Sequence, residues 1–226
     1  MDVLHLDNHL LVVNKPPGVL VQADRTGDVD LLTMGKAFVK QRFNKPGDVF
    51  LGLVHRLDRP ASGVMVFART SKAAARLSEQ FRTRTVEKYY AAVVEGHLEG
   101  AGVARDDIVS GERSVRIAEA GEGGGRGAEM QWRAVAEEND LTLVIVQLKT
   151  GRKHQIRVQL AAMGHPILGD FRYAATRPLD GKNLALHCYR LGFRHPTTKE
   201  WLVFEAPPPW TGLFEPEMQA EIGGDV

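Results

Sequence analysis

Asp58 is the residue of this chain whose neighbours most strongly suggest chemistry. His55, Arg56 and Arg59 lie within three residues of it, and a proline and a Ser-Gly pair follow. Adjacent cations favour the ionised form of a carboxyl group, and an ionised carboxylate suits a nucleophile better than a general acid. The alternative is a salt-bridged aspartate in a surface turn, which is a common structural feature.

A second cluster of cations surrounds Arg157. Arg152, Lys153 and His154 precede it at the start of a helix that the pattern predicts over 151–164. The N-terminus of a helix is the unfavourable end for cations, so the cluster makes sense chiefly if an anion lies there. That anion is a phosphate, a protein carboxylate or both. On spacing alone, a solvated basic turn is an equal alternative.

Other catalytic and metal-binding patterns are absent from the sequence. The eight histidines show no His-Glu-x-x-His motif and no paired ligand spacing, so no metal site is predicted. Neither a P-loop nor a Gly-x-Ser-x-Gly elbow occurs. Gly123, Gly125 and Ala128 formally match a dinucleotide-binding pattern, but in a charged loop instead of between a strand and a helix. The single cysteine, Cys188, excludes an internal disulfide and is predicted to be a core residue.

The composition is that of an ordinary globular protein. Of 226 residues, 43% are hydrophobic and 25% charged. No apolar run approaches the length of a membrane span, and the first residues lack the pattern of a secretory signal. We therefore expect a cytoplasmic protein without a membrane association, and a monomer by default. The net charge of +1 means that nucleic-acid binding would depend on a local basic face.

The elements that position these residues are mostly strands. Helices are predicted from Asp30, which would cap the first, from Ser71, which would cap the second, and over 151–164. Extended segments are predicted at 3–13, 64–68, 86–94 and 141–148. The last third of the chain is predicted to form a hairpin around a turn at 195–198. The polar, glycine-rich stretch 101–130 is predicted to be a variable hairpin or a mobile loop.

This order of elements shows no regular βαβ alternation. It favours the α+β class with a mixed sheet over a doubly wound fold. We see no internal repeat and no linker between domains, so a single domain over residues 1–226 is predicted.

Four short motifs occur in order along most of the chain. They are Lys-Pro-Pro-Gly at 15–18, His-Arg-Leu-Asp-Arg-Pro-Ala-Ser-Gly at 55–63, Lys-Tyr-Tyr-Ala-Ala-Val-Val at 88–94, and Thr-Gly-Arg-Lys-His-Gln-Ile-Arg at 150–157, which Gly-His-Pro-Ile-Leu-Gly-Asp at 164–170 continues. Together they resemble the motifs of the RluA-type pseudouridine synthases. The second motif is similar to that family's His-Arg-Leu-Asp-x-x-Thr-Ser-Gly signature.

The resemblance implies a pseudouridine synthase fold: a mixed, mostly antiparallel sheet with flanking helices and a central catalytic cleft. It implies an isomerase that converts uridine in ribosomal or transfer RNA into pseudouridine, with no cofactor and no metal. Because the resemblance starts within the first strand, we expect no appended RNA-binding domain.

The resemblance also implies roles for individual residues. Asp58 matches the catalytic carboxylate, Tyr90 the tyrosine that stacks on the uracil, and Arg157 the arginine that pairs with the carboxylate. Reaching a uridine in structured RNA requires flipping it out of its stack. The residues that would contact RNA are Arg56, which would help to fill the vacated space, Arg59, Lys88, Arg152, Lys153 and His154. Lys15 and Gln22 either border the cleft or serve a structural role.

Three features depart from the family pattern. Ala61 replaces a threonine, Gln159 replaces a frequent histidine, and a loop expected before Trp132 lacks the usual Ala-x-Thr-x-Tyr. An RNA-binding module that has lost catalysis is therefore one alternative. A hydrolase using Asp58 with a second carboxylate is another, and it would release a free base. A non-enzymatic scaffold explains none of the motifs.

Overall fold

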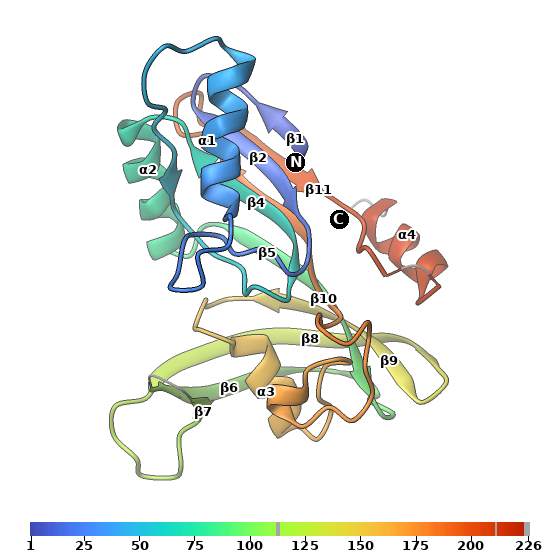
Figure 1. Cartoon of the computed structure of the whole chain (residues 1–226). Coiled ribbons are helices and arrows are strands. Elements are labelled where there is room, and N and C mark those ends of the chain that lie inside the picture. The colour runs from blue at the N-terminus through green and yellow to red at the C-terminus, as the bar shows by residue number, and fades with distance from the viewer. Residues whose placement is uncertain (112–113, 211, 224–226) are drawn as a thin grey trace. The chain divides into compact units, whose positions relative to one another are not determined.

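The computed structural model describes residues 1–111, 114–210 and 212–223 (Figure 1). These residues contain eleven strands and four α-helices. The chain divides into two compact units, which we call unit 1 (Met1–Val86 and Tyr189–Pro209) and unit 2 (Glu87–Cys188 and the segment from Trp210). The prediction of an α+β fold on a mostly antiparallel sheet is confirmed. The single domain over residues 1–226 stays a prediction.

Unit 1 is built on antiparallel strand pairs. The pairs are β1 (Asp2–Leu6) with β2 (Leu10–Lys15), β2 with β4 (Ser62–Ala68), β3 (Gly52–Leu53) with β4, and β10 (Leu186–Arg194) with β11 (Trp201–Glu205). β4 is buried along its whole length, which explains its continuous run of apolar residues. The predicted hairpin around 195–198 is confirmed as β10 and β11.

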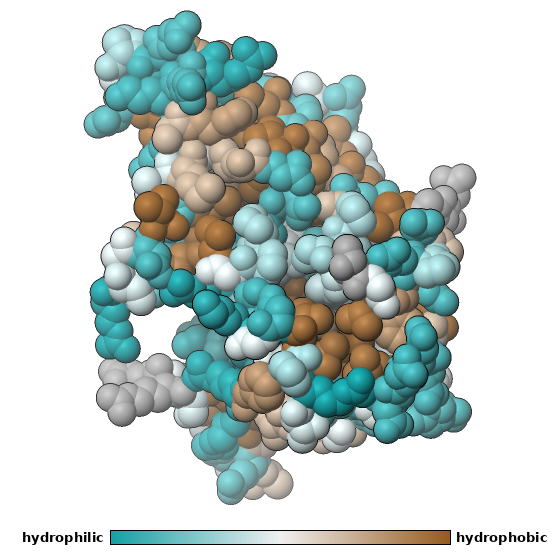
Figure 2. Space-filling view, turned by 45° about the vertical axis from the view of Figure 1, so that its right-hand side comes forward, coloured by the Kyte–Doolittle hydropathy of each residue, from teal (hydrophilic) through white to brown (hydrophobic). Residues whose placement is uncertain are grey.

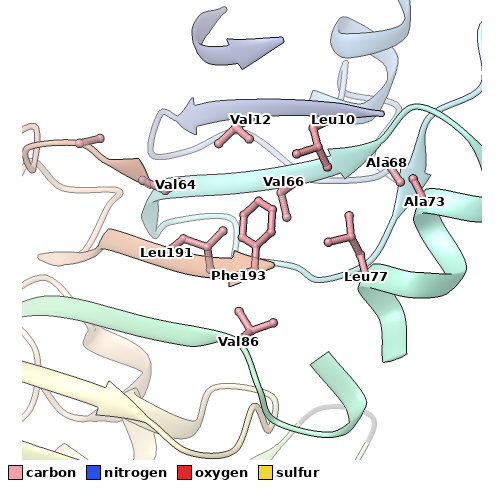
Figure 3. Packing of buried hydrophobic residues seen from close by; sticks show 11 residues of the cluster. Leu10, Val12, Val64, Val66, Ala68, Ala73, Leu77, Val86, Leu191 and Phe193 are labelled. Carbon is pink, nitrogen blue, oxygen red and sulfur yellow. The ribbon is translucent and has the colours of Figure 1, made fainter. Parts of the chain in front are cut away.

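The core of unit 1 lies between this sheet and helix α2 (Ser71–Arg82). Figure 3 shows side chains from β2, β4, β10 and α2 converging on one cluster. Its members include Leu10, Val12, Val64, Val66, Leu77, Leu191 and Phe193. Since alternate residues of a strand face the same side, Leu10 and Val12 of β2 enter the cluster together, as do Val64, Val66 and Ala68 of β4.

Two helices of unit 1 begin at capping residues. α1 (Leu31–Arg42) has the predicted cap, because the Asp30 carboxylate accepts the amide of Thr33 at 3.0 Å. The predicted cap of α2, Ser71, is wrong by one residue. Thr70 has the extended backbone of a cap, and its hydroxyl accepts the amide of Ala73 at 3.1 Å.

Unit 2 is a second antiparallel arrangement. Its strands follow the order β5 (Glu87–Glu95), β9 (Leu141–Leu148), β8 (Arg126–Glu138), β6 (Ala101–Ser110) and β7 (Val115–Ile117). In the stretch 101–130, predicted to be a variable hairpin or a mobile loop, the described residues form antiparallel pairs: β6 pairs with β7, and with β8 from Ala101↔Arg133 to Ile108↔Arg126. The loop expected before Trp132 lies at 118–125, further from Trp132 than predicted, because residues 126–131 belong to β8, in which Trp132 pairs with Val146.

Three helical segments complete unit 2. α3 (Gln155–Ala162) packs on β6 and β7, where Val158 joins Ile108, Val115 and Ala128 in a small core. A 3-10 turn, η1 (Phe171–Tyr173), follows α3, and α4 (Glu215–Gly223) lies near the C-terminus. Of the helices described, none is both long and apolar enough to cross a membrane.

Candidate active site

Asp58 lies on a tight turn in unit 1 that leads into β4. The amide of Ala61 donates to the Asp58 carbonyl at 3.2 Å and closes the turn. The side chain of Asp58 is half-buried, whereas Arg56 and Arg59 are exposed. The backbone therefore holds the carboxylate at the edge of the core, with cations on the solvent side.

Lys15, the last residue of β2, holds this turn from within. Its side chain is fully buried, and its ammonium donates to the carbonyls of Pro16 at 3.0 Å, Arg59 at 3.1 Å and Ala61 at 2.6 Å. Burial lowers the pKa of Lys15 to about 7, and the negative charge of Asp58 opposes that shift. An amine has only two N–H bonds, so all three hydrogen bonds exist only in the ammonium form. In its ammonium form, Lys15 therefore fixes the turn through three carbonyls and also places positive charge near the Asp58 carboxylate.

The turn at 15–18 packs directly against the Asp58 turn. The amide of Gly18 donates to the carbonyl of Arg59 at 2.9 Å, and the Arg59 Nε donates back to the Gly18 carbonyl at 3.0 Å. An ion pair of 2.6 Å joins Arg59 to Asp28. These contacts are internal to unit 1, so the exposed Arg59 has a structural role beside its predicted RNA contact.

His55 anchors the start of the same turn. Its Nε2 accepts the amide of Val66 at 3.0 Å, and its ring stacks on Phe81 with centroids 4.6 Å apart. An Nε2 that accepts a hydrogen bond from an amide is unprotonated, so this histidine is neutral. We conclude that His55 and the buried Leu57 orient the turn, while Arg56 between them faces solvent.

Tyr90 and Lys88 lie on one face of β5 in unit 2, as the period of two predicts. Tyr90 is 7% exposed. Burial raises the pKa of the Cys188 thiol to about 12, against the opposing effects of a hydrogen bond with Tyr90 and the charge of Lys88. Cys188 is therefore buried and protonated at neutral pH, as we expected for a core residue. An added Cβ on Gly151 would meet the Lys88 ammonium at 3.7 Å, which places Lys88 beside the loop before α3.

Arg157 is the third residue of α3 and forms a buried ion pair with Asp170. Its Nε donates to Oδ2 at 2.7 Å and its Nη2 donates to Oδ1 at 2.8 Å. The two side chains are 6% and 2% exposed. One member of the predicted cluster of cations, Arg157, is therefore paired within unit 2 with a protein carboxylate. The sequence reasoning did not assign a role to Asp170, although it is the last residue of the matched motif; the pairing of Arg157 with Asp58 stays a prediction.

The loop before α3 is tied to strand β8. The hydroxyl of Thr150 donates to Gln155 Oε1 at 2.8 Å, and Gln155 Nε2 donates to the Glu129 carbonyl at 3.1 Å. The Nε of Arg152 donates to the Gly127 carbonyl at 2.9 Å. Arg152 is consequently half-buried with a structural contact, whereas its neighbour Lys153 is exposed.

Two residues that depart from the family pattern, Gln159 and Ala61, are buried. Gln159 is buried, and its Nε2 donates to the Asp106 carboxylate at 2.6 Å. Ala61 is 1% exposed and accepts the shortest hydrogen bond of Lys15. Trp132 covers Gly102, where an added Cβ would meet the indole at 3.2 Å.

Comparison with known proteins identifies the family. The sequence model of the RNA pseudouridylate synthases matches residues 9–162. The chain belongs to this family. It is 36% identical to the dual-specificity RNA pseudouridine synthase RluA of Pasteurella multocida, over 92% of this chain and 93% of that protein. It is 33% identical to ribosomal large subunit pseudouridine synthase D of Zymomonas mobilis, over 92% of this chain and 69% of that protein.

A solved structure agrees with this assignment. The structure titled human RNA pseudouridylate synthase domain containing 4 matches with a TM-score of 0.78 at 26% identity, covering 100% of this chain and 94% of that one. The RNA pseudouridine synthase class predicted from the motifs, an isomerase, is confirmed. Among the residues that the structure describes, no group of three or more His, Cys, Asp or Glu side chains is arranged to hold a metal ion.

Proposed function

We propose that this chain converts specific uridines in ribosomal or transfer RNA into pseudouridine, with Asp58 as its catalytic carboxylate. The observation that carries the proposal is the Asp58 turn, which matches the family signature and is clamped by the buried Lys15. A relative named as dual-specific and another named for the large ribosomal subunit support RNA as the substrate.

The reaction breaks the N1–C1′ bond, turns the uracil and joins C5 to C1′; a general base removes the proton from C5, and N1 takes up a proton in place of its bond to C1′. The reaction is an isomerisation that consumes no second substrate, so it requires neither an oxidant nor a cofactor. Asp58 acts at the junction of ribose and base, either at C1′, on the uracil ring or as a base at the ribose. Each of these roles needs an ionised carboxylate.

Tyr90 and Arg157 are the other two residues to which we assign catalytic roles. Tyr90 is a mostly buried aromatic side chain on the rigid strand β5, which suits a ring that stacks on the uracil and assists removal of the C5 proton. The pair with Asp170 holds the guanidinium of Arg157 through its Nε and Nη2 groups, which suits a side chain that must keep one orientation. We assign Arg157 the role that the family resemblance implies, which is to orient the catalytic carboxylate.

RNA binding in this proposal depends on individual cations. On the face shown in Figure 2, hydrophilic residues are interspersed with apolar patches instead of forming one continuous surface. The proposed phosphate and base contacts are Arg56, Arg59, Lys88, Arg152, Lys153 and His154. Base flipping costs a few kcal/mol, which such contacts and Arg56 in the vacated space would offset. We propose the cytoplasm as the location and a monomer as the active form.

The test is to express the chain in a strain depleted of its own pseudouridine synthases and to map pseudouridine across ribosomal and transfer RNA. An Asp58→Asn variant is expressed in parallel. We expect new pseudouridines that the variant does not make, and their positions name the substrate. Unchanged RNA despite a folded wild-type protein contradicts the proposal, and release of free uracil would identify a hydrolase instead.

A further inference from the structure

Asp170 is held in place by its own segment of unit 2. Gly169 before it has a φ of 86°, and a Cβ added there would collide with the carbonyl oxygen of Asn183. The amide of Asp170 donates to the Ile167 carbonyl at 2.9 Å, and its carbonyl accepts the amide of Tyr173 at 2.9 Å. Only glycine suits the left-handed backbone in so narrow a space, so the position of the Asp170 carboxylate is set by the backbone.

The same segment is fastened to the strand that carries Tyr90. The amide of Leu168 donates to the Val93 carbonyl at 2.9 Å, and Ile167 forms a β-bridge with Val94. The ion pair with Asp170 therefore places the guanidinium of Arg157 in a fixed relation to β5. A flexible arginine side chain would otherwise have many rotamers available.

A second group of side chains borders the guanidinium. Its central carbon lies 5.0 Å from the centre of the Tyr173 ring. The Tyr173 hydroxyl donates to the Val115 carbonyl at 3.1 Å, so the His154 Nδ1, 2.8 Å from that oxygen, is the donor to it. His154 itself has a φ of 54°, which non-glycine residues rarely adopt. Strained backbone of this kind persists where the surrounding structure enforces it.

We propose that Asp170 is a positioning residue of the uridine isomerisation, acting through Arg157. Its carboxylate occupies the Nε and Nη2 edge of the guanidinium and so fixes the orientation of the arginine to which we assign a catalytic role. The inference rests on the proposed function, since it assumes that Arg157 belongs to the active site. It assigns Asp170 a role in the rate of the chemical step and none in binding RNA.

The test compares Asp170→Asn with the wild type in pseudouridine formation on a transcript of the RNA segment mapped in the depleted strain. Misplacement of a catalytic group by about 1 Å costs about 100-fold in rate, so we expect kcat to fall by roughly 10- to 100-fold. We expect KM to stay within about twofold, because the asparagine does not alter the exposed cations. Glu122→Gln, which breaks the exposed ion pair with Arg116 in the same unit, is the matched control and should leave both constants unchanged.

Removing one partner of a buried ion pair destabilises a protein, so thermal melting decides whether Asp170→Asn is folded at the assay temperature. If it is not, Asp170→Glu replaces it, since that variant keeps the charge but moves the carboxylate by one methylene. A lower kcat at unchanged KM in the folded variant supports the inference. An unchanged kcat, or a higher KM alone, overturns the inference while leaving the proposed function intact. A wild-type protein that forms no pseudouridine overturns both.

Discussion

Lys15 is predicted to make the stability of the protein depend on pH. Its pKa is about 7 in the folded protein, below the ordinary value of 10.5 that applies to the unfolded chain. Between these values the unfolded chain binds more protons, so the free energy of unfolding rises with pH across this window. Each pH unit contributes about 1.4 kcal/mol, so the full window contributes about 5 kcal/mol.

The assay is urea unfolding of the wild type and Lys15→Met at pH 7.5 and 9.5. The methionine removes the titrating group but keeps a long side chain in the buried site. Over these two pH units we expect the wild type to gain about 2 to 3 kcal/mol relative to the variant. Equal changes in the two proteins would refute the reasoning, because they would mean that Lys15 remains an ammonium up to pH 9.5.

The remaining predictions concern RNA binding and the core of unit 1. Lys153→Ala should lower the slope of log affinity against log salt by about 0.7 to 0.9 at unchanged kcat, because one phosphate contact is lost. Lys45→Ala, an exposed lysine outside the motifs, should leave the slope unchanged, and equal slopes for both variants would contradict the assignment. Leu77→Ala removes a fully buried side chain and should cost about 2 to 5 kcal/mol in urea unfolding. Ser78→Ala, at an exposed position of the same helix, should change stability by about 0.5 kcal/mol or less, and a comparable loss in both variants would contradict the packing argument.

Local signals in the sequence were sufficient for several elements. Asp30 precedes an amphipathic segment and caps α1, and the cations before Arg157 coincide with the N-terminus of α3. The run 64–68 is apolar at every position, which is typical of a strand buried on both faces, and it lies within β4. In each case the residues that determine the structure are neighbours in the chain.

Other features depend on contacts between distant segments, which a single sequence does not reveal. Asp170 pairs with Arg157 through the fold of the segment after α3, and only the motif match drew attention to it. Lys15 reaches carbonyls 44 and 46 residues away, so its turn was equally open to a structural and a functional interpretation. In strands β6 and β8, exposed residues alternate with partly buried ones along much of the strand. The polar composition and the glycines of this segment made it resemble a loop.

The most direct test of the central claim is tritium release from RNA labelled at C5 of uridine, because forming the new C5–C1′ bond expels that hydrogen. The wild type and Asp58→Asn are compared on the same RNA at equal binding occupancy, with folding checked by thermal melting. We predict stoichiometric release together with pseudouridine from the wild type, and a rate lower by roughly 10²- to 10⁴-fold or more from the variant. Release at the wild-type rate by Asp58→Asn would contradict the assignment of Asp58 as the catalytic carboxylate.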